Sequence, residues 1–244
     1  MCSEVSIIIP TLNESDCLQG TLDNLALLNP PAKEILIVDG GSDDHTPEIA
    51  RQAGIPVLVS TQASRSSQMN LGASAAKGNF LCFLHADTLV PNDLTVLIAK
   101  TLNDRTISCG GFISIMSGRD RTRWVVSLHN YLKSYYAAII FRPHLFIKGL
   151  RILFGDQVIF CRRRDFEDCG GFDPKLPIME DADLCIKLVQ YGRTYLVNRI
   201  VQSSDRRVAK WGSFKANLIY LYIGCLWGVG VSATYLKRFY EDIR

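Results

Sequence analysis

An acidic side chain ends a short apolar run near the start of the sequence. Asp39 comes directly after residues 35–38, and Gly40 and Gly41 follow it. An acid at this position can accept hydrogen bonds from a nucleobase or a ribose hydroxyl, while the glycines let a ligand approach the backbone closely. The alternative is an Asx turn without a ligand. We predict that Asp39 contacts a nucleotide.

A second carboxylate follows another apolar run and suits a metal ion. Residues 80–84 lead into His85, Ala86, Asp87 and Thr88. At the edge of a nucleotide crevice, a carboxylate can hold Mg2+ or Mn2+, which bridges two phosphates and neutralises the charge on a departing diphosphate. Taken alone, Asp87 could instead be a turn residue or a helix cap. We predict that Asp87 binds a divalent metal.

Three acids open a predicted helix near residue 180. Glu180, Asp181 and Asp183 precede an apolar face that includes Leu184 and Leu188. The helix dipole favours acids in a first turn, and this accounts for at least one of the three. A carboxylate that projects into the crevice could act as a general base on an acceptor hydroxyl, and burial beside like charges would raise its pKa. Glu180 and Asp181 are therefore candidate catalytic residues.

Two further polar segments adjoin the predicted strands. Residues 10–14 follow the first apolar run and offer a hydroxyl, an amide and a carboxylate to a nucleoside, or form a turn in which Asn13 caps the next helix. Residues 64–72 open a helix with Arg65 beside its first turn. A helix N-terminus with an arginine is a natural site for pyrophosphate, and a surface cap is the alternative.

Strands and helices must alternate to bring these residues together. Short apolar runs lie at residues 5–9, 35–38, 56–59, 80–84 and 108–115, and amphipathic segments separate them. This pattern is typical of a parallel sheet covered by helices on both faces. Such sheets bind ligands at the carboxyl ends of their strands. We therefore expect the polar residues above to meet at one rim of a doubly wound sheet.

The second part of the chain has weaker patterns. Residues 118–154 mix aromatic, apolar and basic types, which predicts an amphipathic helix or an acceptor loop. A strand over residues 155–163 and a helix over residues 180–191 follow. Residues 217–236 carry no charge and are long enough to cross a membrane. Three glycines in this stretch favour helices that pack on the domain or lie at a membrane surface.

Composition limits the class of protein. The 244 residues are 48% hydrophobic and 21% charged, which suits one globular domain with a C-terminal appendage. A net charge of +3 does not indicate a nucleic acid partner, although basic residues crowd between positions 119 and 215, where a phosphate or an anionic membrane could bind. Eight scattered cysteines without a CxxC pair indicate reduced core residues. Without a secretory signal, we expect the cytosol or its membrane face.

The order of these segments resembles the GT-A glycosyltransferases of family 2. The resemblance runs through residues 5–14, 37–42, 83–88, 170–172 and 179–181, and covers about residues 5–200. It implies a Rossmann-like GT-A α/β fold with a mostly parallel sheet flanked by helices. It also implies inverting transfer of sugar from a nucleotide-diphosphate donor to a hydroxyl acceptor. Finer similarity, which includes residues 68–70 and 204–207, is to small bacterial members named for arsenosugar biosynthesis.

Site residues follow from the resemblance. Asp87 occupies the place of the metal-binding Asp-X-Asp motif, with Mg2+ or Mn2+ as the cofactor, and Asp181 is the catalytic base with Glu180 beside it. Asp156 and Gln157 contact the acceptor or the donor sugar, or else bond only within the fold. The nucleotide-sugar site then comprises Pro10, Thr11, Asn13, Glu14, Asp39, Arg65, Gln68, Ala86, Asp87, Asp156 and Gln157.

Two departures from the family pattern refine the prediction. His85 stands where the family usually has its first Asp, which leaves a single carboxylate for the metal. The Gln-X-X-Arg-Trp signature of polymerising members is absent, so we expect addition of a single sugar. One alternative is transfer to a polyprenyl phosphate at the membrane, and another is a sugar-nucleotide-binding protein without catalysis. The acceptor is accordingly a small molecule or a lipid-linked one.

The predicted organisation has three parts. Residues 1–205 form the catalytic domain, with a nucleotide-binding half over residues 1–116 and an acceptor half over residues 117–205. Residues 206–244 form an apolar and basic helical region, for which peripheral membrane contact is expected. The sequence does not indicate an oligomeric state.

Overall fold

The structure is a computed structural model, and it describes residues 3–118 and 121–240. Its strands are β1 (Val5–Thr11), β2 (Glu34–Asp39), β3 (Val57–Val59), β4 (Phe80–Phe83), β5 (Thr88–Leu89), β6 (Ile107–Ser117), β7 (Ile159–Arg162) and β8 (Arg193–Ser204). Its helices are α1 (Ser15–Leu25), α2 (Thr46–Gln52), α3 (Arg65–Ala75), α4 (Leu94–Asn103), α5 (Trp124–Phe141), α6 (Pro143–Ile147), α7 (Arg163–Asp168), α8 (Glu180–Leu188), α9 (Arg206–Trp211), α10 (Ser213–Gly228) and α11 (Ala233–Leu236). Short 3-10 turns occupy Gly155–Gln157 and Lys237–Phe239.

The described strands form one eight-stranded sheet in the order β3-β2-β1-β4-β7-β6-β8-β5. The first four strands in this order are parallel, as the apolar runs predicted. β7 lies antiparallel between β4 and β6, and β8 is parallel to β6. The predicted α/β fold is confirmed. The doubly wound part, however, ends at β4, because β6 pairs with β7 and β8 instead of extending it.

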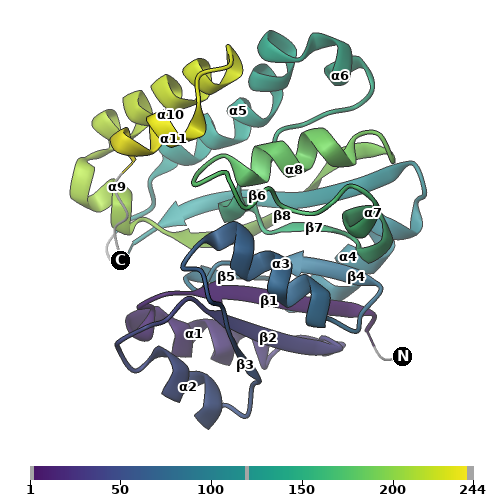
Figure 1. The fold of residues 1–244 in the computed structure, drawn as a ribbon, viewed down its shortest axis with the longest axis vertical. Helices are drawn as coiled ribbons and strands as arrows, with labels where there is room; N and C mark the ends of the chain where they lie inside the picture. The colour runs from purple at the N-terminus through teal and green to yellow at the C-terminus, as the bar shows by residue number, and fades with distance from the viewer. Residues whose placement is uncertain (1–2, 119–120, 241–244) are drawn as a thin grey trace.

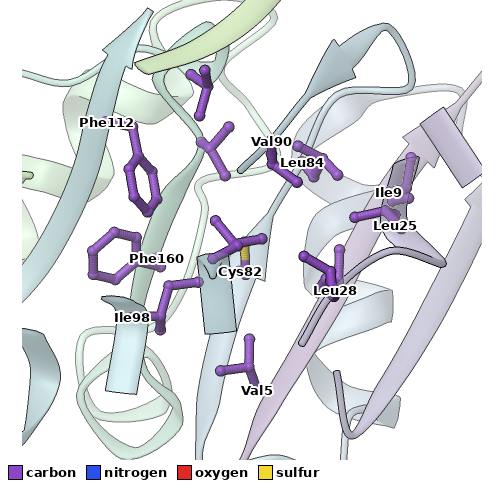
Figure 2. Close-up of a cluster of buried hydrophobic side chains, with 14 of the residues drawn as sticks. Val5, Ile9, Leu25, Leu28, Cys82, Leu84, Val90, Ile98, Phe112 and Phe160 are labelled. Atoms are coloured by element: carbon purple, nitrogen blue, oxygen red, sulfur yellow. The ribbon is translucent and has the colours of Figure 1, made fainter. Parts of the chain in front are cut away.

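Helices cover both faces of the sheet (Figure 1). Alternate residues of β1 point to opposite faces, so Ile7 and Ile9 join one core and Ile8 joins the other. The first core packs the strands against α1 and α4, and Figure 2 shows part of it around Cys82 and Phe160. The second core packs them against α3, α7 and α8. Burial on both faces explains why the strands read as continuous apolar runs.

The cysteines behave as predicted within the described residues. All of those described are free, and four are buried: Cys82, Cys109, Cys161 and Cys185. Desolvation raises the pKa of the Cys82 thiol well above its usual range. These side chains therefore serve as small apolar core residues.

Two strands differ from the sequence expectation. The strand predicted over residues 155–163 is shorter, because Gly155–Gln157 form a turn and Val158 takes a left-handed backbone with φ 54° before β7 begins. β8 was not predicted, although it spans Arg193–Ser204. A register shift opposite Phe112 and Ile113 of β6 interrupts its alternation of buried and exposed residues. This irregularity hides the period of two by which strands are usually recognised.

The C-terminal helices gather with α5 at one end of the molecule, away from α1 and α2 (Figure 1). Residues 118–154 contain the predicted helix, as α5, followed by α6. The uncharged stretch over residues 217–236 is divided between α10 and α11, and Gly230 turns the chain between them with φ 96°. In the described ranges, no helix combines the length and apolar character needed to cross a membrane.

Candidate active site

A cavity of about 230 Å3 lies at the rim of the sheet, between the ends of β1 and β4, the start of α8, and α9 and α10. A second cavity of about 420 Å3 adjoins it. The two share the wall residues Pro10, Glu14, Arg65, Ile178, Glu180 and Tyr240. Because these residues come from both ends of the chain, the crevice exists only when the whole fold has assembled.

The structure brings most of the predicted site residues to this crevice. The first cavity is lined by Pro10, Glu14, Arg65, Ala86, Asp87, Asp156, Glu180 and Asp181. Thr11 and Gln68 line the second cavity. Asn13, Asp39 and Gln157 line neither of the two. The binding and catalytic roles of all these residues stay predictions.

Asp39 is buried, with 3% of its surface exposed, and it is held by hydrogen bonds within the protein. Its Oδ1 accepts from Thr11 Oγ1 at 3.0 Å and from Ser42 Oγ at 2.6 Å. Its Oδ2 accepts from the backbone N–H of Gly41 at 2.9 Å and of Ser42 at 2.8 Å. The structure therefore contains the turn that the sequence left as the alternative to a nucleotide contact.

Three amide side chains near the crevice are also engaged within the fold. Gln68 donates from Nε2 to the carbonyl oxygens of Thr11 and Val38, both at 2.7 Å. Gln157 is buried and accepts from the Phe154 N–H at 3.0 Å, and Asn13 accepts from the Asp43 N–H at 3.0 Å. These bonds fix the loops that border the cavities.

Arg206 joins two of the predicted donor-site acids. Its Nη2 donates to Oε2 of Glu14 at 2.7 Å and to Oδ2 of Asp87 at 2.9 Å. Glu14 precedes α1, Asp87 follows β4 and Arg206 opens α9, so three distant segments meet at one ion-paired cluster. The guanidinium neutralises charge that two neighbouring carboxylates would otherwise repel.

His85 and Asp181 pack on Gly155. A Cβ at position 155 would lie 2.3 Å from His85 Nε2 and 2.9 Å from Asp181 Oδ2, so only glycine fits between them. Burial and, to a lesser extent, the nearby Arg65 charge lower the pKa of His85 to about 3, although the Asp87 charge opposes this. His85 is therefore neutral at physiological pH and brings no positive charge to the crevice.

Glu180 and Asp181 open α8 in different electrostatic states. Glu180 Oε1 accepts from Arg65 Nη1 at 3.2 Å, and the carboxylate is largely buried. Burial and, to a lesser extent, the Glu180 charge raise the pKa of Asp181 to about 8, although the Arg65 charge opposes this. Glu180 thus has an arginine partner, while its neighbour Asp181 holds a proton near neutral pH. A carboxyl with such a pKa can act as a general base or acid.

A metal ion would find few ligands here. No cluster of three or more His, Cys, Asp or Glu side chains suited to a metal occurs within residues 3–118 and 121–240. Asp87 offers one carboxylate, which Arg206 contacts. Mg2+ is commonly held by one or two carboxylates together with waters and substrate phosphates. The site therefore fits a divalent ion that takes most of its ligands from a diphosphate.

Sequence reasoning gave no role to several side chains of the first cavity, namely Asn130, Lys133, Arg206, Arg207, Tyr220 and Tyr240. Arg206 and Arg207 follow β8 closely, so a strand-end position was the available signal, but β8 itself was not recognised. Lys133 and Tyr220 lie on α5 and α10, and only the packing of these two helices turns them toward the cavity.

A family comparison covers most of the chain. The sequence model of the family described as Glycosyl transferase family 2 matches residues 6–170. A PGL/p-HBAD biosynthesis glycosyltransferase of Mycobacterium tuberculosis (strain H37Rv) is 26% identical over 189 residues, which cover 75% of this chain and 68% of the relative. An uncharacterized glycosyltransferase of Rickettsia prowazekii is 24% identical over 227 residues, which cover 89% of this chain and 69% of that protein.

Solved structures share the fold. Glucosyl-3-phosphoglycerate synthase from Mycobacterium tuberculosis, in complex with Mn2+, UDP and phosphoglyceric acid, superimposes with a TM-score of 0.64 at 20% identity, covering 94% of this chain and 79% of that one. Staphylococcus aureus TarS (residues 1–349) does so with a TM-score of 0.61 at 15% identity, covering 98% of this chain and 69% of the other.

Proposed function

Because the chain belongs to glycosyl transferase family 2 and is a nucleotide-sugar-dependent glycosyltransferase, we propose that it moves a single sugar onto an acceptor hydroxyl with inversion at the anomeric carbon. The observation that carries the proposal is that Asp87 and Asp181, from distant segments, line one cavity. Asp87 serves the departing diphosphate and Asp181 serves the incoming acceptor.

The acceptor side of the reaction depends on Asp181. The ionised carboxylate takes the proton from the acceptor hydroxyl while the hydroxyl oxygen attacks the anomeric carbon. The bond from that carbon to the diphosphate breaks, and the diphosphate leaves with the electron pair. Attack opposite to the leaving group inverts the configuration. Support for this role comes from the raised pKa of Asp181, because a base works best when its pKa lies near the working pH.

The donor side depends on Asp87 and the cations around it. We assign Mg2+ or Mn2+ to Asp87, where the ion would neutralise charge on the departing diphosphate. The Mn2+ and UDP bound to the glucosyl-3-phosphoglycerate synthase that shares this fold support the assignment. Arg206 already touches Asp87, and Arg65 lines both cavities, so both guanidinium groups are placed to contact donor phosphates.

We propose that the two halves bind the ligands predicted from the sequence, and that the C-terminal region also contributes to the site. Residues 1–116 bind the nucleotide and residues 117–205 bind the acceptor. Residues 206–244 join the acceptor half, because Arg207, Tyr220 and Tyr240 line the first cavity, although Arg206 contacts the donor-side acids Glu14 and Asp87. The C-terminal region then completes the site. Membership of the arsenosugar subgroup stays a prediction.

A second candidate is transfer to a lipid-linked acceptor at a membrane surface. Large apolar side chains are exposed along neighbouring helices, including Trp124, Val125, Leu128, Leu132, Ile139 and Ile140 on α5 and Phe214, Leu218, Leu221 and Tyr222 on α10. Exposed apolar side chains on two helices that contact each other, together with the exposed Lys148 after α6 and Lys215 on α10, favour the interface of an anionic membrane. Activity that disappears when lipid is removed would favour this candidate over a soluble acceptor.

A thermal-shift experiment tests the proposed function. UDP, GDP and dTDP are each added with Mg2+ or Mn2+ to the parent protein, to Asp87→Ala and to Lys100→Met, a control at an exposed residue of α4. A nucleotide that binds the folded state raises the melting temperature. We expect one nucleotide with metal to do so in the parent and the control, but not in Asp87→Ala. Absence of any nucleotide shift, or an equal metal-dependent shift in Asp87→Ala, would refute the donor assignment.

Turnover separates an enzyme from a binding protein. The nucleotide sugar identified by the panel is incubated with the parent protein, and release of free nucleotide is followed. Slow donor hydrolysis supports a catalytic site even before the acceptor is known. Binding of the donor without any release, unaltered by Asp181→Asn, would favour the non-catalytic alternative.

A further inference from the structure

Four basic side chains line the first cavity, and they fall into two pairs: Arg65 and Arg206, and Lys133 and Arg207. The first pair is neutralised, because Arg65 contacts Glu180 and Arg206 contacts Glu14 and Asp87. Within the described residues, neither Lys133 nor Arg207 has a carboxylate at ion-pair distance. The second pair therefore carries positive charge that the folded chain does not balance by contact.

The side chain of Lys133 is unusual because it carries an ammonium group in a buried position. The residue lies on α5 with 8% of its surface exposed. Its ammonium group is 3.7 Å from the centre of the Phe154 ring and 5.4 Å from that of Tyr220. Burial lowers its pKa to about 8, and the charge of Asp156 works against this. Burying a cation without a paired anion is costly, which indicates that the Lys133 ammonium is paired by an anionic ligand.

Arg207 stands in a similar environment. Its Nη1 donates to the hydroxyl of Tyr240, and the guanidinium carbon is 4.2 Å from the centre of that ring. Its Nε is buried and has no hydrogen-bond partner within the described residues. Tyr220 of α10 interacts electrostatically with Arg207, and the Lys133 ammonium lies over its ring. The aromatic side chains Tyr220 and Tyr240 thus link the two cations along one wall.

The nearby carboxylate does not cancel this charge. Asp156 lines the same cavity, but its Oδ2 accepts from Asn130 Nδ2 at 2.7 Å, and burial raises its pKa. Within the described residues, the Asp156 carboxyl forms an ion pair with neither Lys133 nor Arg207. Lys133, Arg207 and Tyr220 of this wall lie on α5, α9 and α10, and Tyr240 follows the second 3-10 turn. The residues assigned to the donor lie at the ends of β1 and β4 and at the starts of α3 and α9, where Arg65 and Arg206 stand.

We propose that Lys133 and Arg207 form a subsite for an anionic group of the acceptor, a phosphate or a carboxylate, beside the hydroxyl that receives the sugar. This inference rests on the proposed function and specifies its acceptor class. An ammonium and a guanidinium bind such groups by charge-assisted hydrogen bonds, and the Tyr220 and Tyr240 hydroxyls can add neutral ones. The anionic group then holds the acceptor while Asp181 takes the proton from its hydroxyl.

Phosphate binding in the presence of nucleotide tests the subsite. Inorganic phosphate is titrated into the protein with saturating Mn2+ and the nucleotide found in the panel, so that the donor site is filled. We expect phosphate to raise the melting temperature of the parent and of Lys100→Met. For Lys133→Met we expect apparent affinity for phosphate to fall at least about tenfold, with nucleotide affinity changed less than about twofold. Lys133→Arg should restore most of the phosphate effect.

Three results would overturn the inference. Phosphate could stabilise Lys133→Met as much as the parent, which would place the anion elsewhere. Lys133→Met could lose nucleotide and phosphate together, which would assign the cations to the donor. Arg207→Gln, a second variant in case Lys133→Met does not fold, could keep full phosphate affinity. In the first and third results nucleotide binding persists, so the proposed function would survive, whereas failure of all nucleotides to bind would refute the function itself.

Vesicles distinguish the source of the anionic group. Phosphatidylcholine vesicles with and without polyprenyl phosphate are sedimented with the parent, Lys133→Met and Lys100→Met. A lipid phosphate predicts extra binding to the polyprenyl phosphate vesicles that Lys133→Met loses and that free phosphate competes away. A soluble acceptor predicts no difference between the two vesicles, with the phosphate effect in the thermal assay unchanged. Either pattern supports the subsite and identifies its ligand.

Discussion

Asp39 lies in residues 1–116, the proposed nucleotide-binding half, and Asp181 lies in residues 117–205, the proposed acceptor half. Both are buried acids, but their surroundings differ. Asp39 accepts four hydrogen bonds from Thr11, Gly41 and Ser42. Asp181 lies beside Glu180, and burial raises its pKa to about 8. The same contrast holds for the cations, because Arg206 is ion-paired whereas Lys133 is not.

The difference indicates in which half the buried polar groups already have partners within the protein before a ligand binds. Polar groups around β1 and β2 are satisfied by the protein, so this half presents a fixed framework to the donor. The acceptor half retains buried groups that the protein leaves unbalanced. Buried polar groups are costly unless paired, and such groups concentrate at functional sites. We infer that acceptor specificity resides in these unbalanced groups.

The largest expected effect tests Asp181 as the unbalanced acid. Asp181→Asn keeps the size of the side chain but removes the base, so we expect the turnover number to fall by about 10²–10⁴-fold. Nucleotide binding, measured by thermal shift, should not change. In the parent, turnover should rise with pH toward about 8, because only the ionised form of Asp181 accepts a proton. Transfer by the variant at the parental rate would exclude this residue as the base.

A smaller effect tests Asp39 as the satisfied acid. Asp39→Ala leaves four donors without an acceptor, so we expect the free energy of unfolding to fall by about 3 kcal/mol and the melting temperature by about 5–10 °C. Asp39→Asn should lose much less, because its oxygen can accept from the two backbone N–H groups while its NH2 donates to the two hydroxyls. Thermal unfolding of both variants, with the exposed Asp16→Asn as the control, measures this. Equal stability of Asp39→Ala and the parent would contradict a structural role.

The smallest effect concerns stability against pH. The Asp181 carboxyl ionises near pH 4 in the unfolded chain, but burial keeps it protonated to about pH 8 in the folded protein. The contribution of the protonated Asp181 carboxyl to the free energy of unfolding is therefore fully present below about pH 4, and it is lost as the pH rises toward 8. We expect Asp181→Asn to melt a few degrees above the parent at pH 7 and at the same temperature near pH 4. A difference that is independent of pH would show that ionisation is not its cause.

The sequence predicted the nucleotide-binding half well because its order is local. Each strand from β1 to β4 contains a short, mostly apolar run, and burial on both faces favours such runs. The polar residues after these runs then follow from the rule that parallel strands end at one rim. Glu14 and Asp87, which follow the first and fourth runs, both line the first cavity, and their roles stay predictions.

The acceptor half was harder to predict because distant packing determines it. β8 breaks its alternation at a register shift against β6, so the strand was not recognised and the arginines that follow it were given no role. Lys133 resembles any lysine on a helix until α10 covers it. Asp39 could not be assigned from the sequence for a different reason. A carboxylate directly after a strand can contact a ligand or hold a turn equally well. Only the positions of Thr11 and Ser42 decide between these two.

The contact between Glu14 and Arg206 spans 192 residues of sequence. Ribosomes make a protein from its N-terminus, so Glu14 and Asp87 emerge long before the guanidinium that binds them. During synthesis there is therefore a stage in which the two acids lack this counter-ion. Shortening the protein to residue 205, as a way to remove its apolar tail, would make that stage permanent.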